Sequence, residues 1–151
     1  MVNKHIEITM KKRVLIIGVG GFVGSSVAES LLQKNYEVIG VDNFQFGYLD
    51  RIKDFVDQIE LKQKDFNLMR FDKIENIDLI INCAAIAPLP ENQKDHFESI
   101  KTNVAMCGSV IDFACINGIK KIIHFSSSAV YENGISKNGI EANINDDLCP
   151  R

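Results

Sequence analysis

Three glycines with a fixed spacing are the first residues of this sequence that could do chemistry. Gly18, Gly21 and Gly24 form the pattern G-x-x-G-x-x-G, directly after a short apolar run and directly before a helical pattern. A pyrophosphate needs backbone N–H groups that point at it, no Cβ in its way, and the positive end of a helix dipole behind it. The pattern therefore predicts a turn that binds a dinucleotide, with Phe22 and Val23 among its binding residues. The alternative is a tight turn that binds nothing.

A carboxylate follows at the distance that this chemistry requires. Asp42 stands 18 residues after Gly24, at the end of the second apolar run, where it can accept hydrogen bonds from the ribose hydroxyls of adenosine. A 2′-phosphate there would meet a negative charge, and Asn43 and Phe44 follow instead of an arginine. The sequence therefore favours NAD over NADP. Taken alone, Asp42 would be interpreted as a solvated turn residue, but its register with the glycines favours the binding role.

Short apolar runs alternate with helical patterns, and these elements must position the turn and the acid. The predicted strands are residues 14–17, 37–41, 59–62, 79–83 and 121–125. The predicted helices are residues 22–34, 48–56 and 96–117. This alternation predicts an α/β fold of the Rossmann type, a doubly wound parallel sheet with strand order 3-2-1-4-5. The cofactor crevice should lie between the first and fourth strands, at their carboxyl ends.

Composition is typical of one soluble globular domain. The chain has 151 residues, of which 46% are apolar and 25% charged, with a net charge of -3. Because it has no run of lysine and arginine, we expect neither nucleic acid nor a membrane surface as a partner. No stretch approaches the roughly 20 apolar residues of a membrane-spanning helix. We therefore expect a cytoplasmic protein.

The cysteines and histidines predict no metal site. Cys83, Cys107, Cys115 and Cys149 form no C-x-x-C pair and have no histidine at ligand spacing. Reduced structural thiols are the expected state. His124 lies inside a predicted buried strand, so we expect a hydrogen-bonded histidine of the core.

These motifs resemble the extended short-chain dehydrogenase/reductase family, the NAD-dependent epimerases and dehydratases of nucleotide sugars. The glycine turn has that family's spacing, and Asp42 with Asn43 resembles its ribose-binding segment. The resemblance implies that Asp65 contacts the adenine amino group, with Phe66 beside it.

Two later segments extend the resemblance along the chain. The sequence N-C-A-A, which contains Cys83, Ala84 and Ala85, resembles a segment whose backbone lies along the cofactor in this family. The sequence T-N-V around Asn103 is similar to a signature in the family's long helix. The resemblance therefore adds these four residues to the cofactor-binding set.

The closest match is the stretch after the fifth predicted strand. Residues 126–131 resemble the family's S-S-x-x-V-Y segment, which implies that Ser127 carries a catalytic hydroxyl. Glu132 replaces the glycine that usually follows the tyrosine. For Tyr131 the resemblance implies a packing role beside the nicotinamide, since the family's acid/base tyrosine is another residue.

The family's acid/base motif Y-x-x-x-K is missing from this chain. Glycine or isoleucine stands four residues after each of Tyr36, Tyr48 and Tyr131. We therefore expect residues 1–12 to be a leader and residues 13–151 to be an NAD-binding domain that is truncated before Y-x-x-x-K and the substrate domain. The C-terminal part of the family fold is then missing as well. Such a chain should bind a dinucleotide and turn over nothing.

The resemblance also narrows the reaction of the parent enzyme. The family's dehydratases and decarboxylases carry an acidic residue in the segment that here reads Ser127, Ser128 and Ala129, whereas a 4-epimerase needs only the hydroxyl and the tyrosine. This favours a 4-epimerase that acts on a nucleotide sugar. The alternatives are a dinucleotide sensor without catalysis and an NAD-dependent reductase of another carbonyl.

The long helical pattern carries two apolar stripes. We expect the first stripe to cover the sheet; it contains Phe97, Ile100, Val104, Cys107, Ile111 and Ala114. The second stripe, Met106, Val110 and Phe113, then needs another partner. Because the resemblance places a subunit interface on this helix, we expect a weak homodimer or a promiscuous association through the second stripe.

Overall fold

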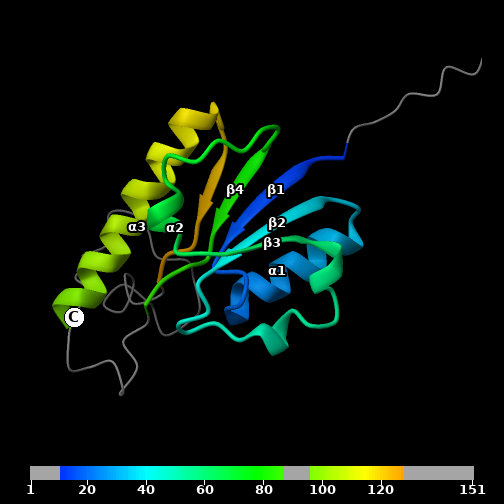
Figure 1. The fold of residues 1–151 in the computed structure, drawn as a ribbon, viewed down its shortest axis with the longest axis horizontal. Coiled ribbons are helices and arrows are strands. Elements are labelled where there is room, and N and C mark those ends of the chain that lie inside the picture. The colour runs from blue at the N-terminus through cyan, green and yellow to red at the C-terminus, as the bar shows by residue number, and fades with distance from the viewer. Residues whose placement is uncertain (1–10, 87–95, 128–151) are drawn as a thin grey trace, which may run out of the picture.

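A computed structural model describes residues 11–86 and 96–127 of the chain (Figure 1). The expected roles of Tyr131 and Glu132, the thiol of Cys149 and most of the leader lie outside the described residues. In chain order the elements are β1 Arg13–Ile17, α1 Phe22–Gln33, β2 Glu37–Asp42, two 3-10 helices Leu49–Arg51 and Val56–Gln58, β3 Glu60–Gln63, α2 Phe66–Met69, β4 Leu79–Asn82, α3 His96–Asn117 and β5 Ile122–His124.

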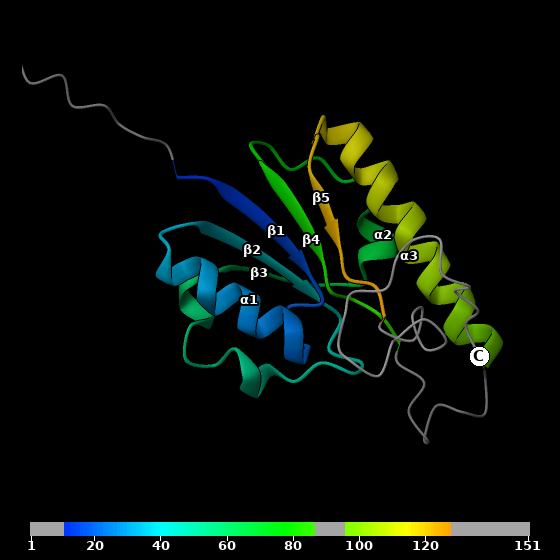
Figure 2. The same cartoon turned by 180° about the vertical axis from the view of Figure 1, so that it is seen from behind.

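The five strands form one parallel sheet in the order β3-β2-β1-β4-β5. The predicted strand order is therefore confirmed. Helix α1 covers one face of the sheet, and α2 and α3 cover the other (Figures 1 and 2). Alternate residues of β1 enter the two cores, Val14 and Ile16 on the α1 side and Leu15 and Ile17 on the α3 side.

The prediction of which stripe of α3 covers the sheet was wrong. Val110 and Phe113 are buried, whereas four members of the other stripe are 56–72% exposed, namely Phe97, Ile100, Val104 and Ile111. Helix α2 supplies the reason, because the ring of Phe66 lies 5.3 Å from that of Phe113. The sequence patterns did not predict α2. Without it, nothing indicated which of the two stripes of α3 packs against the sheet.

Two further local predictions were wrong. Residues 48–56 form no continuous helix, because Ile52 and Phe55 are the buried residues of this segment and a short 3-10 helix on either side is enough to bury them. His124 is hydrogen-bonded to Asn82 as expected, but it is exposed and not part of the core, since β5 is an edge strand of the described sheet and Ile122 and Ile123 beside it are 41% and 49% exposed.

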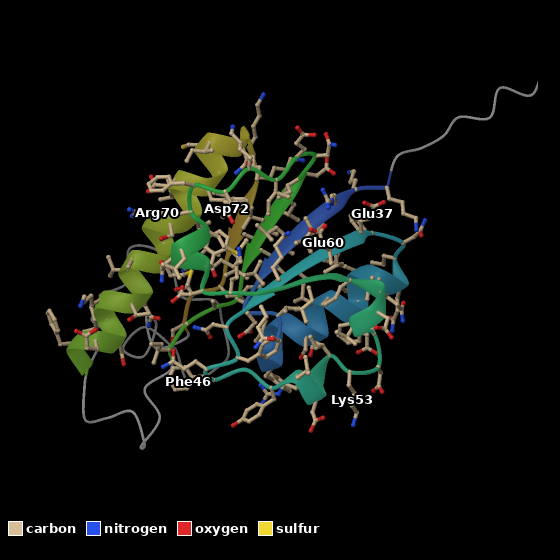
Figure 3. The ribbon with its side chains drawn as sticks, in the orientation of Figure 1. Glu37, Phe46, Lys53, Glu60, Arg70 and Asp72 are labelled. Atoms are coloured by element: carbon tan, nitrogen blue, oxygen red, sulfur yellow. The ribbon has the colours of Figure 1, made fainter. Side chains whose placement is uncertain are left out.

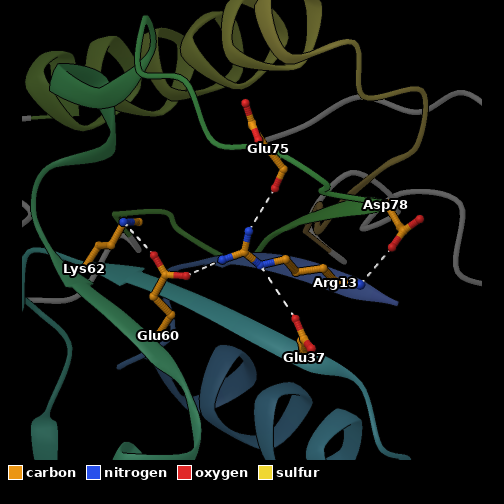
Figure 4. A network of polar contacts seen from close by, with 6 residues as sticks. All are labelled: Arg13, Glu37, Glu60, Lys62, Glu75 and Asp78. Atoms are coloured by element: carbon orange, nitrogen blue, oxygen red, sulfur yellow. Dashed lines mark hydrogen bonds and ion pairs between the residues drawn. The ribbon is translucent and has the colours of Figure 1, made fainter. Parts of the chain in front are cut away.

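A polar network joins the amino ends of the strands around Arg13 (Figure 4). Its guanidinium pairs with Glu60 of β3, donates to the carbonyl oxygen of Glu75 at 2.8 Å and lies 3.9 Å from Glu37 of β2. The Lys62 ammonium, hydrogen-bonded to Glu60 at 2.8 Å, is the largest cause that lowers the pKa of that carboxyl below its ordinary value. Figure 3 places Glu37 and Glu60 at the opposite end of the sheet from Phe46, so the network lies away from the carboxyl ends.

Candidate functional site

A pocket opens at the carboxyl ends of β1 and β4, where the crevice of an open parallel sheet is expected. Ten of the thirteen predicted cofactor-binding residues line it, namely Gly18, Gly21, Asp42, Asn43, Asp65, Phe66, Cys83, Ala84, Ala85 and Asn103. The remaining three, Phe22, Val23 and Gly24, form the first turn of α1 next to Gly21. The structure therefore brings together residues that are far apart in the sequence.

The glycine turn is packed so tightly that side chains are excluded. Gly18 has a φ of +83°, and a Cβ on it would lie 2.8 Å from the backbone of Ala84. A Cβ on Gly24 would lie 2.0 Å from the carbonyl oxygen of Gly18. Two of the three glycines therefore hold β1, β4 and α1 together, and Gly21 faces the pocket.

The first turn of α1 offers backbone N–H groups to a ligand. Gly21 is the N-cap and has no side chain to satisfy these donors, and the first turn contains no acidic residue. The side chains of Phe22 and Val23 are exposed, and their backbone N–H groups are among those that a helix leaves unpaired in its first turn. An anion such as a pyrophosphate fits this helix end, where a Cβ-free cradle and the positive end of the dipole coincide.

Asp42 is held over this turn by two backbone hydrogen bonds. Its Oδ2 accepts from the N–H of Gly20 at 2.8 Å, and its Oδ1 accepts from the N–H of Phe44 at 2.8 Å. Each carboxylate oxygen keeps a further lone pair, and these can accept from ribose hydroxyls. Asn43 closes an Asx turn by accepting from the N–H of Gln45 at 3.0 Å.

At the far end of the pocket, Asp65 also acts as the N-cap of α2. Its Oδ1 accepts from the N–H of Asn67 at 2.9 Å. Asn67 in turn accepts from the hydroxyl of Ser109 on α3 at 2.7 Å. Phe66 is buried in the core, so the acid that is expected to meet adenine stands on a fixed helix end.

Asn103 fastens the loop that follows β4. Its Oδ1 accepts from the N–H of Ile86 at 2.8 Å, and its Nδ2 donates to the carbonyl oxygen of Ile86 at 3.1 Å. These two hydrogen bonds position the loop at the edge of the pocket. Cys83 lies in the same loop, and burial raises the pKa of its thiol to about 11.

Ser127 lies just beyond β5, and its side chain is exposed. The backbone pairing of β4 with β5 continues past the strand, because the N–H of Phe125 donates to the carbonyl oxygen of Asn82 at 3.0 Å. This carries the chain toward the carboxyl edge of the sheet, where the pocket opens. Ser127 is not among the residues that line the pocket.

Sequence reasoning missed several residues of the pocket. Phe46, Gly47, Thr102 and Met106 line it. The first two follow Asp42 closely, and Thr102 stands in the T-N-V signature itself, so proximity to a recognised motif was the available signal. Among the described residues no group of three His, Cys, Asp or Glu side chains could hold a metal ion.

One described helix has the length and composition to cross a membrane, over Phe97–Asn117 of α3. Its Val110 and Phe113 are buried against the sheet. The same composition is therefore also that of a helix that covers a core.

The fold and the pocket define a class, the Rossmann-type domains that bind dinucleotides between the carboxyl ends of parallel strands. Within this class, residues 14–150 match the family model of the NAD dependent epimerase/dehydratase family, and the chain belongs to that family.

Two relatives of known name are similar in sequence to this chain. The UDP-N-acetyl-alpha-D-glucosaminuronate decarboxylase of Bacillus cytotoxicus is 34% identical over 128 residues, which cover 83% of this chain and 39% of that protein. The UDP-glucuronic acid decarboxylase 1 of Danio rerio is 29% identical over 125 residues, which cover 80% of this chain and 28% of that protein.

Solved structures of similar proteins agree on the fold. The UDP-glucose 4-epimerase of Bifidobacterium longum, in complex with NAD+ and UDP, is 27% identical with a TM-score of 0.70, over 80% of this chain and 38% of that one. The UDP-glucose 4-epimerase of Thermotoga maritima is 22% identical with a TM-score of 0.71, over 82% and 41% of the two chains, and supports the fold alone. The chain thus spans about two-fifths of the length of these structures.

Proposed function

We propose that this chain is the NAD-binding portion, residues 13–151, of an enzyme of the 4-epimerase type that acts on a nucleotide sugar. The observation that carries the proposal is the Asp42 carboxylate, fixed at 2.8 Å by the N–H groups of Gly20 and Phe44 beside the Cβ-free start of α1. This arrangement suits a pyrophosphate and an adenosine ribose at adjacent places. The described residues thus fit the cofactor that is named for the family.

The preference for NAD over NADP follows from the same carboxylate. A 2′-phosphate on the ribose would stand beside the negative charge of Asp42, whose two oxygens are already fixed in place. Like charges at hydrogen-bond distance repel strongly in a partly buried site. Asp42 therefore selects the dinucleotide with the free hydroxyl.

The choice of a 4-epimerase rests on Ser127 and on the two residues after it. NAD, when bound, supplies reversible hydride acceptance. The hydroxyl of Ser127 would hold the sugar oxygen during that exchange. Ser127, Ser128 and Ala129 offer no carboxylate for the expulsion of water or carbon dioxide. Because similar proteins include decarboxylases as well as 4-epimerases, the reaction type is the finer part of the proposal.

The 151-residue chain should bind the cofactor without turnover, because it contains no Y-x-x-x-K to exchange a proton with the sugar oxygen. Isothermal titration with NAD and with NADP tests the binding, and NMR of a UDP-sugar incubated with the chain and NAD tests the turnover. NAD should bind more tightly, and the sugar should stay unchanged. Equal affinities would remove Asp42 from the ribose site, and a changed sugar would refute the expected inactivity.

We further propose that two copies of the chain associate weakly through α3. The supporting residues are those of the exposed stripe, Phe97, Ile100, Val104 and Ile111, in place of the buried stripe that the sequence favoured. Four large apolar side chains on one helix face lower their free energy when a second copy covers them.

A nucleotide sugar is the proposed substrate of the whole enzyme, and a cytoplasmic location is proposed for it.

A further inference from the structure

Three side chains form a line of contacts that the proposed function does not use. His124 ends β5, which runs beside α3 in both views of the fold (Figures 1 and 2). Its Nε2 lies 3.7 Å from Sγ of Cys107 on α3, and its Nδ1 lies 2.9 Å from Nδ2 of Asn82 at the end of β4. Asn82 is fully buried. A cysteine, a histidine and an asparagine from three elements thus meet in one cluster.

Asn82 determines which ring nitrogen of His124 carries the proton. Oδ1 of Asn82 accepts from the backbone N–H of Ala84 at 3.1 Å, so its NH2 group is the one that faces the ring. Nδ1 of His124 must therefore accept, and in the neutral ring the proton is on Nε2. This N–H points at Cys107, whose sulfur receives the hydrogen bond.

The described cysteines differ in their surroundings. Burial raises the pKa of Cys83 to about 11, which keeps that thiol protonated and unreactive. Cys115 is exposed on α3, and Cys107 is half-buried beside His124. The thiolate is the nucleophilic form of cysteine, and an N–H donor aimed at the sulfur is the contact that a thiolate makes best. Cys107 is therefore the cysteine whose surroundings suit a reaction.

We propose that Cys107 is a modification site, at which its thiolate exchanges with a small disulfide such as oxidised glutathione. The sulfur of Cys107 attacks one sulfur of the reagent, the S–S bond of the reagent breaks and a mixed disulfide forms. The other half leaves as a thiolate and takes up a proton from solvent. The reagent itself is the oxidant, and an excess of free thiol reverses the step.

The adduct would also affect the proposed cofactor pocket indirectly, and this part rests on the proposed function. Asn82 holds the N–H of Ala84, and Ala84 lines the pocket together with Met106, the neighbour of Cys107. A peptide on the sulfur would occupy the space of the His124 ring. Asn82 would then lose its partner, and the Ala84 loop would lose its support. Thiolated chain should therefore bind NAD more weakly than the free thiol form.

Reaction of the full chain with oxidised glutathione, followed by mass spectrometry of its peptides, tests the site. The adduct should appear first on Cys107, and it should be absent there in Cys107→Ser and unaffected in the matched control Cys115→Ser.

Two variants of the exposed His124 separate its two contacts. His124→Asn keeps an acceptor for Asn82 and is too short for Cys107, so the rate should fall about tenfold, as for one lost hydrogen bond to a charged group. His124→Gln reaches toward Cys107 with an N–H donor and should keep most of the rate.

A first adduct on Cys115, or equal rates in the unmodified sequence and His124→Asn, would overturn the site. The coupling is read by titration of NAD into thiolated chain and into Cys107→Ser chain treated in the same way. Weaker binding by the thiolated chain alone supports the coupling, and equal binding overturns it. Failure of the untreated chain to bind NAD would refute the proposed function. The mass-spectrometric result would still test, by itself, whether Cys107 is the modification site.

Discussion

Replacement of Gly24 by alanine tests how closely the glycine turn is packed, and Gly108 provides a matched control. Both glycines lie inside helices, α1 and α3, where alanine is favoured over glycine by about 1 kcal/mol. A Cβ on Gly24 would lie 2.0 Å from the carbonyl oxygen of Gly18, whereas a Cβ on Gly108 would have no neighbour within 4 Å. The two substitutions share the helix preference and differ in the clash.

We expect effects of opposite sign on stability. Overpacking costs about 1–3 kcal/mol, and a backbone contact stands at or beyond the upper end of that range. Gly18 cannot withdraw freely, because its N–H donates to the carbonyl oxygen of Val41 at 2.8 Å. After the helix preference is subtracted, Gly24→Ala should lose about 2 kcal/mol, and Gly108→Ala should gain up to about 1 kcal/mol.

Thermal unfolding followed by circular dichroism measures the difference. At about 2–4 °C for each kcal/mol in a chain of this size, the melting temperature should fall by about 4–8 °C in Gly24→Ala and rise by about 2–4 °C in Gly108→Ala. Calorimetry should show loss of NAD binding in Gly24→Ala alone, because displacement of Gly18 moves the turn. A Gly24→Ala variant that melts like the unmodified sequence and binds NAD would refute the described packing of the turn.

Three other predictions follow from contacts elsewhere in the fold. Asp42→Asn removes the charge at the ribose site, so calorimetry should show an NAD affinity lower by about 10- to 100-fold and a smaller loss for NADP; equal losses would contradict the assigned role. The pKa of Glu60 is lowered in the folded chain, so its stabilising contribution is complete above the ordinary glutamate pKa and is lost as the pH falls through the lowered value. Melting curves should accordingly show a weaker acid dependence in Lys62→Met, and an unchanged pH profile would argue against this pairing. Val104→Glu combined with Ile111→Glu should reduce self-association in sedimentation without lowering the melting temperature, and a monomer at high concentration in the unmodified sequence would contradict the dimer.

The strand order and the glycine turn could be predicted from the sequence because their signals are local, whereas Asp65, Phe66, Cys83, Ala84, Ala85 and Asn103 came from the family resemblance. The glycines directly follow the apolar run of β1, and Asp42 ends the apolar run of β2. Parallel pairing then brings the carboxyl ends together without further information. Gly21 was expected at this edge from its place after β1, whereas Asp65 was expected there from the family resemblance, and both line the pocket.

The face of α3 could not be predicted, because it depends on a partner with a weak signal. Helix α2 has only four residues, and its start is set by the Asp65 side chain rather than by periodicity. In the structure, Phe66 of α2 packs against Phe113 and Asn67 accepts from Ser109. These contacts place the face of α3 that carries Phe113 against the sheet and leave Val104 exposed. The prediction that His124 is buried failed for a related reason. A strand at the sheet edge can have the same apolar sequence as a central strand.

Because the Arg13 network lies at the amino ends of the strands, the two ends of the sheet differ in how well they tolerate substitution or labelling. The carboxyl ends hold the pocket, where a single added methyl group meets backbone. The amino ends hold exposed ion pairs such as Arg13 with Glu37, which salt screens and which tolerate exchange of one partner at small cost. A dye or a surface tether attached near Glu37 would therefore report on the domain, or immobilise it for a biosensor, while its ligand-binding edge stays open to solution.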